Sequence, residues 1–182
     1  MVIAITGHTA GIGKILYDHY TATHKVLGYS RANGYDLTIP SQIVNIISDV
    51  SEKADVFINN AYTPENRGAQ LELLEGIYKN WKERAKIIIV NSSLSPIYEK
   101  WYPPKEKMKE YSKSKRALTE QCEKYLWEPA QCRVIDIKLG LVETELARDF
   151  AVSKMNATQL IPYFDFAIKN TLLREMTVQC LC

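Results

Sequence analysis

No apolar run in this sequence approaches the ~20 residues that a bilayer-spanning helix needs, so we expect no membrane segment. The charges nearly cancel. The 23 Lys and Arg residues against 21 Asp and Glu residues give a net charge of +2, too small to favour a nucleic-acid or membrane surface. The four cysteines and three histidines do not stand at the spacing of metal ligands. The opening stretch MVIAITG lacks the charged segment and cleavage site of a signal peptide. We therefore expect a cytoplasmic protein with free thiols and no metal.

Internal repeats, low-complexity tracts and interdomain linkers are also missing, and the 182 residues suit a single domain, 1–182, with a sizeable core. Short runs rich in Val and Ile recur, as expected of strands buried on both faces. Helical patterns separate them; Ile43, Ile46, Ile47 and Val50, for example, follow the i, i+3, i+4, i+7 rule. This alternation predicts an α/β fold, a Rossmann-type doubly wound parallel sheet. The runs cover residues 2–6, 25–29, 55–59, 86–91, 133–138 and 176–181.

The stretch ITGHTAGIGKIL follows the first strand and opens a helix, with glycines at 7, 11 and 13. Glycines in such a turn allow the backbone to approach a pyrophosphate. The helix N-terminus supplies free N–H groups and the positive end of the helix dipole. The stretch therefore predicts a phosphate-binding turn, and the alternative is a tight turn without a ligand.

The stretch YSKSK holds Tyr111 and Lys115 four residues apart, on the helix stripe that is expected to face the sheet. A lysine is rarely found on the apolar, core-facing stripe of a helix unless its charge is paired or has a function. A nearby ammonium favours the phenolate, so Lys115 is expected to lower the tyrosine pKa from its usual ~10. Tyr111 could then act as a general acid or base. The alternative is an ordinary solvated helix face.

Five motifs resemble, in order, those of the short-chain dehydrogenase/reductase family: TGHTAGIG, NNAYTP at 59–64, VNSSLS at 90–95, YSKSK, and LGLVETEL at 139–146. They span most of the chain. The resemblance implies a sheet with strand order 3-2-1-4-5-6-7. It also implies a short substrate-lid region at about 143–175. Only a few residues separate Arg31 from Asp36, which leaves no room for the helix usual between the second and third strands, so the fold is expected to be trimmed.

The resemblance also assigns catalytic roles. Ser93 would hold the substrate oxygen, Tyr111 would be the general acid or base, and Lys115 would also hold the nicotinamide ribose hydroxyls. The chain departs from the family at two positions. The asparagine expected on the fourth helix falls near Gln70, and a usual proline is Leu139.

The choice of cofactor depends on the end of the second strand, where Tyr29 and Ser30 offer no acidic residue for the ribose of NAD. Arg31 follows, and a guanidinium suits the 2′-phosphate of NADP(H). Asp36 and Leu37 resemble the family's adenine-contacting pair. The predicted cofactor-binding residues are Gly7, Thr9, Ala10, Gly11, Ile12, Gly13, Arg31, Asp36, Leu37, Asn60, Ala61, Tyr62, Tyr111, Lys115, Gly140, Val142 and Thr144.

Together these features predict an NADP(H)-dependent oxidoreductase that acts on a small-molecule carbonyl or alcohol, without nucleic acid or membrane partners. Two alternatives stay open. One is a non-catalytic dinucleotide-binding sensor or scaffold, and the other is a nucleotide-sugar carbonyl reductase. The family often packs its fourth and fifth helices between two subunits, so a homodimer is also expected.

Overall fold

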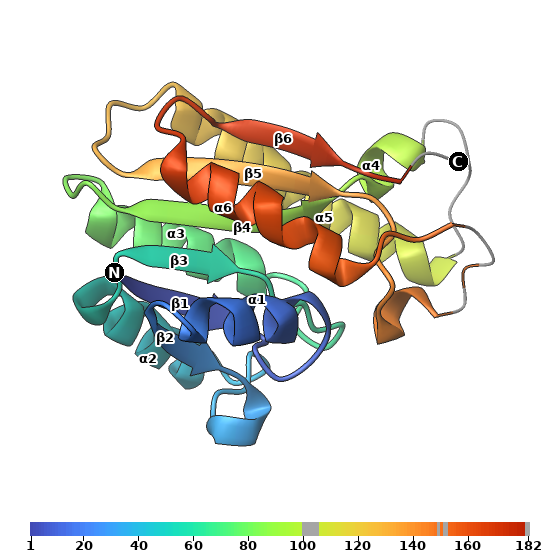
Figure 1. Ribbon diagram of the computed structural model, residues 1–182, viewed down its shortest axis with the longest axis horizontal. Coiled ribbons are helices and arrows are strands. Elements are labelled where there is room, and N and C mark those ends of the chain that lie inside the picture. Colours follow the sequence, from blue (N-terminus) through green and yellow to red (C-terminus); the bar gives the residue numbers. More distant parts are fainter. Residues whose placement is uncertain (100–105, 149, 151–152, 181–182) are drawn as a thin grey trace.

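Each of the six Val- and Ile-rich runs forms a strand in the computed structural model, which describes residues 1–99, 106–148, 150 and 153–180 (Figure 1). The strands form one sheet in the order β2-β1-β3-β4-β5-β6. Every neighbouring pair is parallel. The strands are β1 (Val2–Thr6), β2 (Lys25–Tyr29), β3 (Val56–Asn59), β4 (Ile87–Ser93), β5 (Arg133–Leu139) and β6 (Glu175–Val178).

The observed order is the expected 3-2-1-4-5-6-7 without its first edge strand. In the described residues 30–39 no strand forms. The chain passes from β2 through a short 3-10 helix, η1 (Arg31–Asn33), directly into α2 (Pro40–Lys53). A parallel strand needs a crossover of about a dozen or more residues, which this connection does not contain. β2 is therefore the edge of the sheet.

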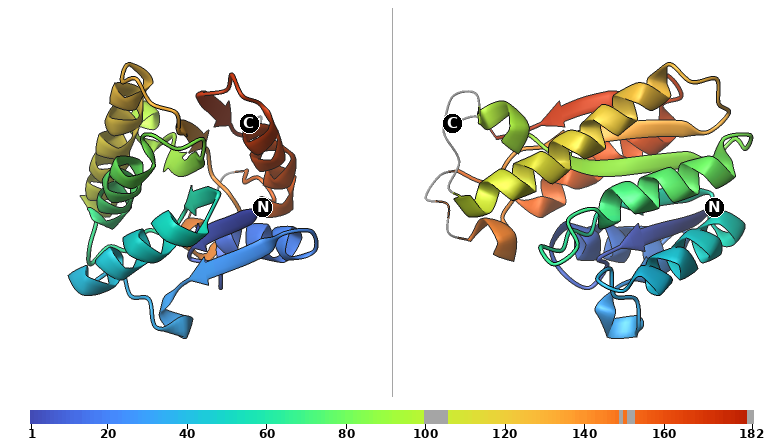
Figure 2. Two further views of the ribbon diagram at one scale, coloured as in Figure 1. Left: turned by 90° about the vertical axis from the view of Figure 1, so that its left-hand side faces the viewer. Right: turned by 180° about the vertical axis from the view of Figure 1, so that it is seen from behind.

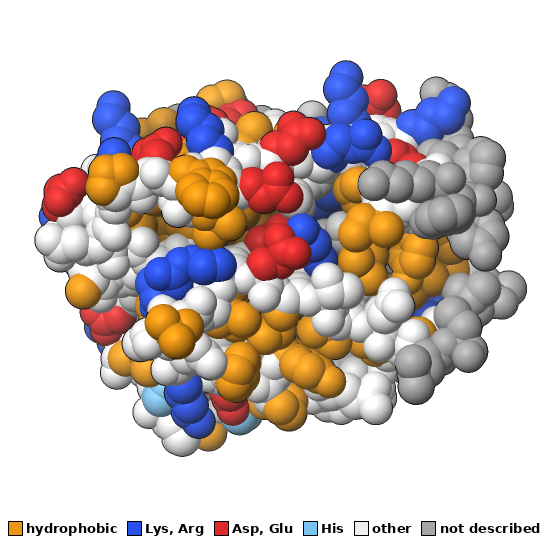
Figure 3. Space-filling view, turned by 90° about the horizontal axis from the view of Figure 1, so that it is seen from above, with side chains coloured by type: hydrophobic (Ala, Val, Ile, Leu, Met, Phe, Trp, Pro, Cys, Tyr) orange, Lys and Arg blue, Asp and Glu red, His pale blue; other side chains and the backbone are white. Residues whose placement is uncertain are grey.

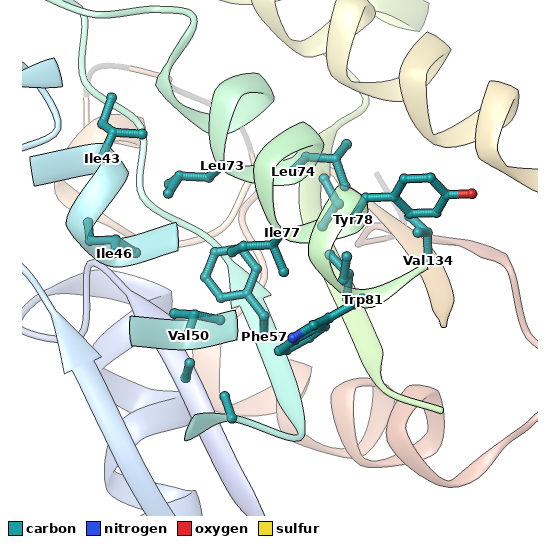
Figure 4. Close-up of a cluster of buried hydrophobic side chains, with 14 of the residues drawn as sticks. Ile43, Ile46, Val50, Phe57, Leu73, Leu74, Ile77, Tyr78, Trp81 and Val134 are labelled. Atoms are coloured by element: carbon teal, nitrogen blue, oxygen red, sulfur yellow. The ribbon is translucent and has the colours of Figure 1, made fainter. Parts of the chain in front are cut away.

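Helices cover both faces of the sheet, as the alternating sequence pattern predicts. In Figure 1, α1 (Gly11–Thr21) and α6 (Ile161–Lys169) lie in front of the sheet. The right-hand view of Figure 2, seen from behind, shows α2, α3 (Ala69–Trp81) and α5 (Glu106–Leu126) on the opposite face of the sheet, toward the viewer. Successive strand residues point to opposite faces, so each strand contributes to two separate cores. The core behind the sheet includes Phe57, Ile77 and Trp81 (Figure 4).

Helix α6 lies within the range where the lid was expected, but it buries Phe164 and Ala167 against the sheet. The chain between β5 and α6 contains two short 3-10 helices, η2 (Glu145–Ala147) and η3 (Ala157–Leu160). A further short helix, α4 (Ser95–Tyr98), follows β4. In a parallel sheet the carboxyl ends of all strands share one edge, so the segments after β1, β3, β4 and β5 meet there.

The surface carries mixed charge. On the face shown in Figure 3, blue Lys and Arg side chains and red Asp and Glu side chains are both present, with orange hydrophobic side chains among them. Among the described residues, no helix is long and apolar enough to cross a membrane. The same part of the chain holds no cluster of three or more potential metal-ligating side chains.

Candidate active site

The glycine turn between β1 and α1 has a backbone that only glycine adopts easily. Gly7 has φ 72° and Gly11 has φ 53°. A side chain at Gly13 would place its Cβ only 2.2 Å from the Gly7 carbonyl oxygen. Among the described side chains, none caps the start of α1 at Ala10, and the first turn of α1 contains no acidic residue. The first N–H groups of α1 are therefore available to an anion.

The other predicted residues of this turn and its neighbours lie around it. Thr9 and Ala10 are exposed, and Ile12 packs partly into the core in front of the sheet. The methyl carbon of Thr144 is 3.5 Å from the ideal Cβ position at Gly11. Two segments 133 positions apart in the chain thus meet at the glycine turn.

A hydrogen-bonded network fixes the segment after β3 against the glycine turn. The Thr6 hydroxyl oxygen accepts from the backbone N–H groups of Asn60, at 2.9 Å, and Ala61, at 3.0 Å. The Asn60 amide donates to the Thr6 carbonyl at 3.0 Å, and the Asn91 amide donates to Asn60 Oδ1 at 2.7 Å. Thr6 and Asn91 were not among the predicted site residues. Both stand inside the quoted motifs, which was the available signal.

The Tyr111–Lys115 pair projects from one side of α5 toward the sheet. Lys115 is only 3% exposed. Its ammonium donates to Gln70 Oε1 at 2.6 Å and to the Asn91 carbonyl at 3.0 Å. It lies 5.5 Å from the centre of the Tyr111 ring and 5.8 Å from that of Tyr62. The two tyrosine rings meet edge to face, with centres 4.9 Å apart.

The expected effect of Lys115 on the Tyr111 phenol is not found. Burial raises the pKa of Tyr111, and a hydrogen bond with Ser93 only partly opposes that effect. Burial also lowers the pKa of Lys115 to about 7, while the Asp136 carboxylate acts in the opposite direction. The prediction that Lys115 lowers the Tyr111 pKa considered only these two side chains and not their burial. In the protein the ammonium is engaged by Gln70 and Asn91, and desolvation decides both shifts.

Ser93, the last residue of β4, lies beside the Tyr111 hydroxyl. Its hydroxyl oxygen accepts from the Ser95 backbone N–H at 3.1 Å, which leaves its proton for the phenol oxygen. Side chains alternate along a strand, so Ser92 points to the opposite face of the sheet from Ser93, toward the buried Asp136 of β5. Of the serines in this segment, Ser93 is the one that acts on the Tyr111 phenol, and its catalytic role stays a prediction.

Short contacts hold the helix that follows Ser93. The Tyr98 hydroxyl at the end of α4 donates to Gln179 Oε1 at 2.7 Å. Arg116 on α5 donates to Glu99 Oε2 at 2.7 Å. These contacts join the α4 segment to the end of β6 and to α5.

At the edge strand, Arg31 lies exposed in η1, close to the predicted adenine-contacting pair. Hydrogen bonds from Thr38 lower the pKa of Asp36, with a smaller contribution from Arg31. The Asp36 Oδ1 atom accepts from the Thr38 N–H at 2.9 Å and from its hydroxyl at 2.8 Å. The Leu37 carbonyl accepts from the Asn66 amide at 2.9 Å. No carboxylate of the described chain forms an ion pair with Arg31, so its guanidinium is open to an anion.

The segment after β5 is held by backbone contacts. Gly140 donates to the Val178 carbonyl at 2.8 Å, and a Cβ at Gly140 would lie 2.8 Å from the Cβ of Gln179. Val142 is buried and forms an isolated parallel bridge with Met155. The structure thus places the predicted residues Gly140, Val142 and Thr144 along the edge where the strands end.

No protein-family model and no curated protein matches the sequence. Solved structures do match. One is a short-chain dehydrogenase from Burkholderia cenocepacia in complex with NADP, with TM-score 0.80 and 20% identity over 97% of this chain and 86% of that chain. Another is the 3-alpha-hydroxysteroid dehydrogenase of a Pseudomonas species complexed with NADH, with TM-score 0.77 and 19% identity over 98% and 95% of the chains.

A third is a short-chain dehydrogenase/reductase from Vibrio parahaemolyticus, with TM-score 0.77 and 17% identity over 97% of this chain and 98% of that chain. Each of these matches covers 97–98% of this chain. At these identities the likeness concerns the backbone. The chain therefore has the fold of the short-chain dehydrogenases/reductases.

Proposed function

We propose that this protein is an NADP(H)-dependent oxidoreductase of the short-chain dehydrogenase/reductase family, acting on a carbonyl or alcohol substrate. The observation that carries the proposal is that Ser93 and Lys115 both lie at Tyr111, while the start of α1, after the glycine turn, has no side-chain cap. The similar solved structures described as complexes with NADP or NADH support the same class of cofactor. The bound cofactor supplies or accepts a hydride.

The chain's own residues suit that cofactor. Gly7, Gly11 and the free N–H groups at the start of α1 would bind the pyrophosphate. Arg31 would bind the 2′-phosphate, because its guanidinium is exposed and forms no ion pair in the described chain. The Asp36 carboxylate would accept from the adenine amine through Oδ2, since Thr38 occupies Oδ1.

Tyr111 would act as the general acid of carbonyl reduction. Its raised pKa keeps the phenol protonated at neutral pH, which is the form that donates a proton to a carbonyl oxygen. Ser93 would bind the same oxygen, because its hydroxyl is the group that favours the ionised form of the Tyr111 phenol. Lys115 would hold the nicotinamide ribose hydroxyls, which is the role that the resemblance implies for it.

The proposal is tested by following NADPH oxidation by the purified protein against a panel of aldehydes, ketones and nucleotide-sugar ketones. Turnover of simple carbonyls supports the proposal, and turnover of only the nucleotide-sugar ketones supports the narrower reductase. Tight NADPH binding with no turnover across the panel would instead favour a non-catalytic sensor. Failure to bind either NADPH or NADH would refute the proposal.

A further inference from the structure

Gln70, on the first turn of α3, lies at the centre of a buried polar network and is only 4% exposed. Its Nε2 atom donates to the Asn59 carbonyl at 3.0 Å, and its own backbone carbonyl accepts from the Asn59 amide at 2.7 Å. Its Oε1 atom accepts from the Lys115 ammonium at 2.6 Å. The network therefore links the end of β3 to α3 and α5.

The orientation of the Gln70 amide follows from its neighbours. The Asn59 carbonyl can only accept a hydrogen bond, so the NH₂ group of Gln70 must face it. The carbonyl oxygen of the amide is then turned to Lys115, whose ammonium can only donate. A flipped amide would place two acceptors together and two donors together. The contact with Lys115 is therefore determined by the buried backbone around it.

We propose that Gln70 is a positioning residue that orients the Lys115 ammonium for its role beside Tyr111, through a direct hydrogen bond from the place where the resembled family often has an asparagine. An ammonium has three N–H groups in a tetrahedral arrangement. Gln70 Oε1 and the Asn91 carbonyl engage two of them, which fixes the direction of the third. In the described chain no acceptor takes the third N–H. The catalytic meaning of this inference depends on the proposed oxidoreductase function.

The same contact stabilises the charged form of Lys115. The other titratable groups that face this ammonium are the Asp136 carboxylate from β5 and the phenols of Tyr62 and Tyr111. Burial lowers the pKa of Lys115 to about 7, and Asp136 raises it. A hydrogen bond to a charged group typically changes proton affinity roughly tenfold or more. Gln70 therefore helps to decide how much ammonium exists at neutral pH.

Two variants of nearly the same shape test the inference in opposite directions. Gln70→Leu removes the acceptor, so the titration midpoint of Lys115 should fall by about one pH unit or more. Gln70→Glu places a carboxylate beside the ammonium, so the midpoint should rise. The midpoint is measured by NMR on protein with ¹³C-labelled lysine side chains, without cofactor, and the Lys115 signal is assigned by its loss in Lys115→Arg. Asn80→Ala, on the exposed side of α3, is the control and should shift nothing.

Opposite shifts in the two variants support the inference. A midpoint that stays at the parent value in both folded variants overturns it and leaves Gln70 as a packing residue only. If Gln70→Leu does not fold, an unchanged midpoint in Gln70→Glu still overturns it. These titrations need neither cofactor nor substrate, so their failure is separate from a failure of the proposed function. If the parent turns over, the alkaline limb of its pH–rate profile should shift in the same directions as the midpoints.

Discussion

Replacing Tyr111 by phenylalanine removes one oxygen atom and leaves the ring in its edge-to-face contact with Tyr62. The cost in stability is small, because the hydrogen bond of a phenol is typically worth about 0.5–1.5 kcal/mol. The Ser93 oxygen keeps its contact with the Ser95 N–H. The cost in catalysis is larger. General acid catalysis contributes about 10²–10⁴-fold, or about 2.7–5.4 kcal/mol of barrier.

The two costs are separated by measuring turnover, NADPH affinity and thermal unfolding on the same preparation. We expect turnover to fall by at least about 100-fold, while NADPH affinity and the unfolding temperature stay close to the parent values. Tyr125→Phe is the matched control, since Tyr125 lies on the same helix but stacks on Tyr78 away from the site, with ring centres 3.6 Å apart. Turnover of Tyr111→Phe within tenfold of the parent would refute Tyr111 as the general acid.

Three further predictions concern the cofactor and the assembly. Arg31→Ala should weaken NADPH binding roughly tenfold to a hundredfold and leave NADH binding nearly unchanged; equal affinities of the parent for both cofactors would contradict this. Gly13→Ala forces a Cβ against the Gly7 carbonyl, so it should lower the unfolding free energy by about 1–3 kcal/mol and abolish NADPH binding, whereas Gly68→Ala meets no such contact and should do neither. The face of α3 and α5, which holds a groove of about 220 Å³ that includes Leu71, should pair two subunits; a light-scattering mass near the 20.8 kDa of one chain at micromolar concentration would reject the dimer.

The strands and the glycine turn could be predicted because their signals are local. A Val- and Ile-rich run that is buried on both faces needs no partner to be recognised, and all six such runs form strands. Glycines at 7 and 11 mark positions where the backbone has positive φ. The missing edge strand had a local signal too, since the connection after Arg31 has no room for a crossover helix. The predicted order 3-2-1-4-5-6-7 nevertheless included this edge strand, which the observed sheet lacks in the described residues.

The electrostatics of the site could not be predicted, because they depend on contacts between distant parts of the chain. Helical spacing places Tyr111 and Lys115 on one side of α5, but it does not say which atoms receive the ammonium. Those atoms belong to Gln70 and Asn91, which lie 45 and 24 positions away from Lys115 in the sequence. Their approach to α5 follows from the order of β3 and β4 in the sheet.

Burial changes the pair in a way that spacing alone does not suggest. A low-dielectric environment disfavours both the phenolate and the ammonium, so the pKa of Tyr111 rises and that of Lys115 falls. Gln70, Asn91 and Asp136 all favour the charged form of Lys115 and so oppose this effect of burial on the ammonium. The glutamine that looked like a departure from the family at the level of sequence is, in the folded chain, one of the groups that keep Lys115 charged beside Tyr111.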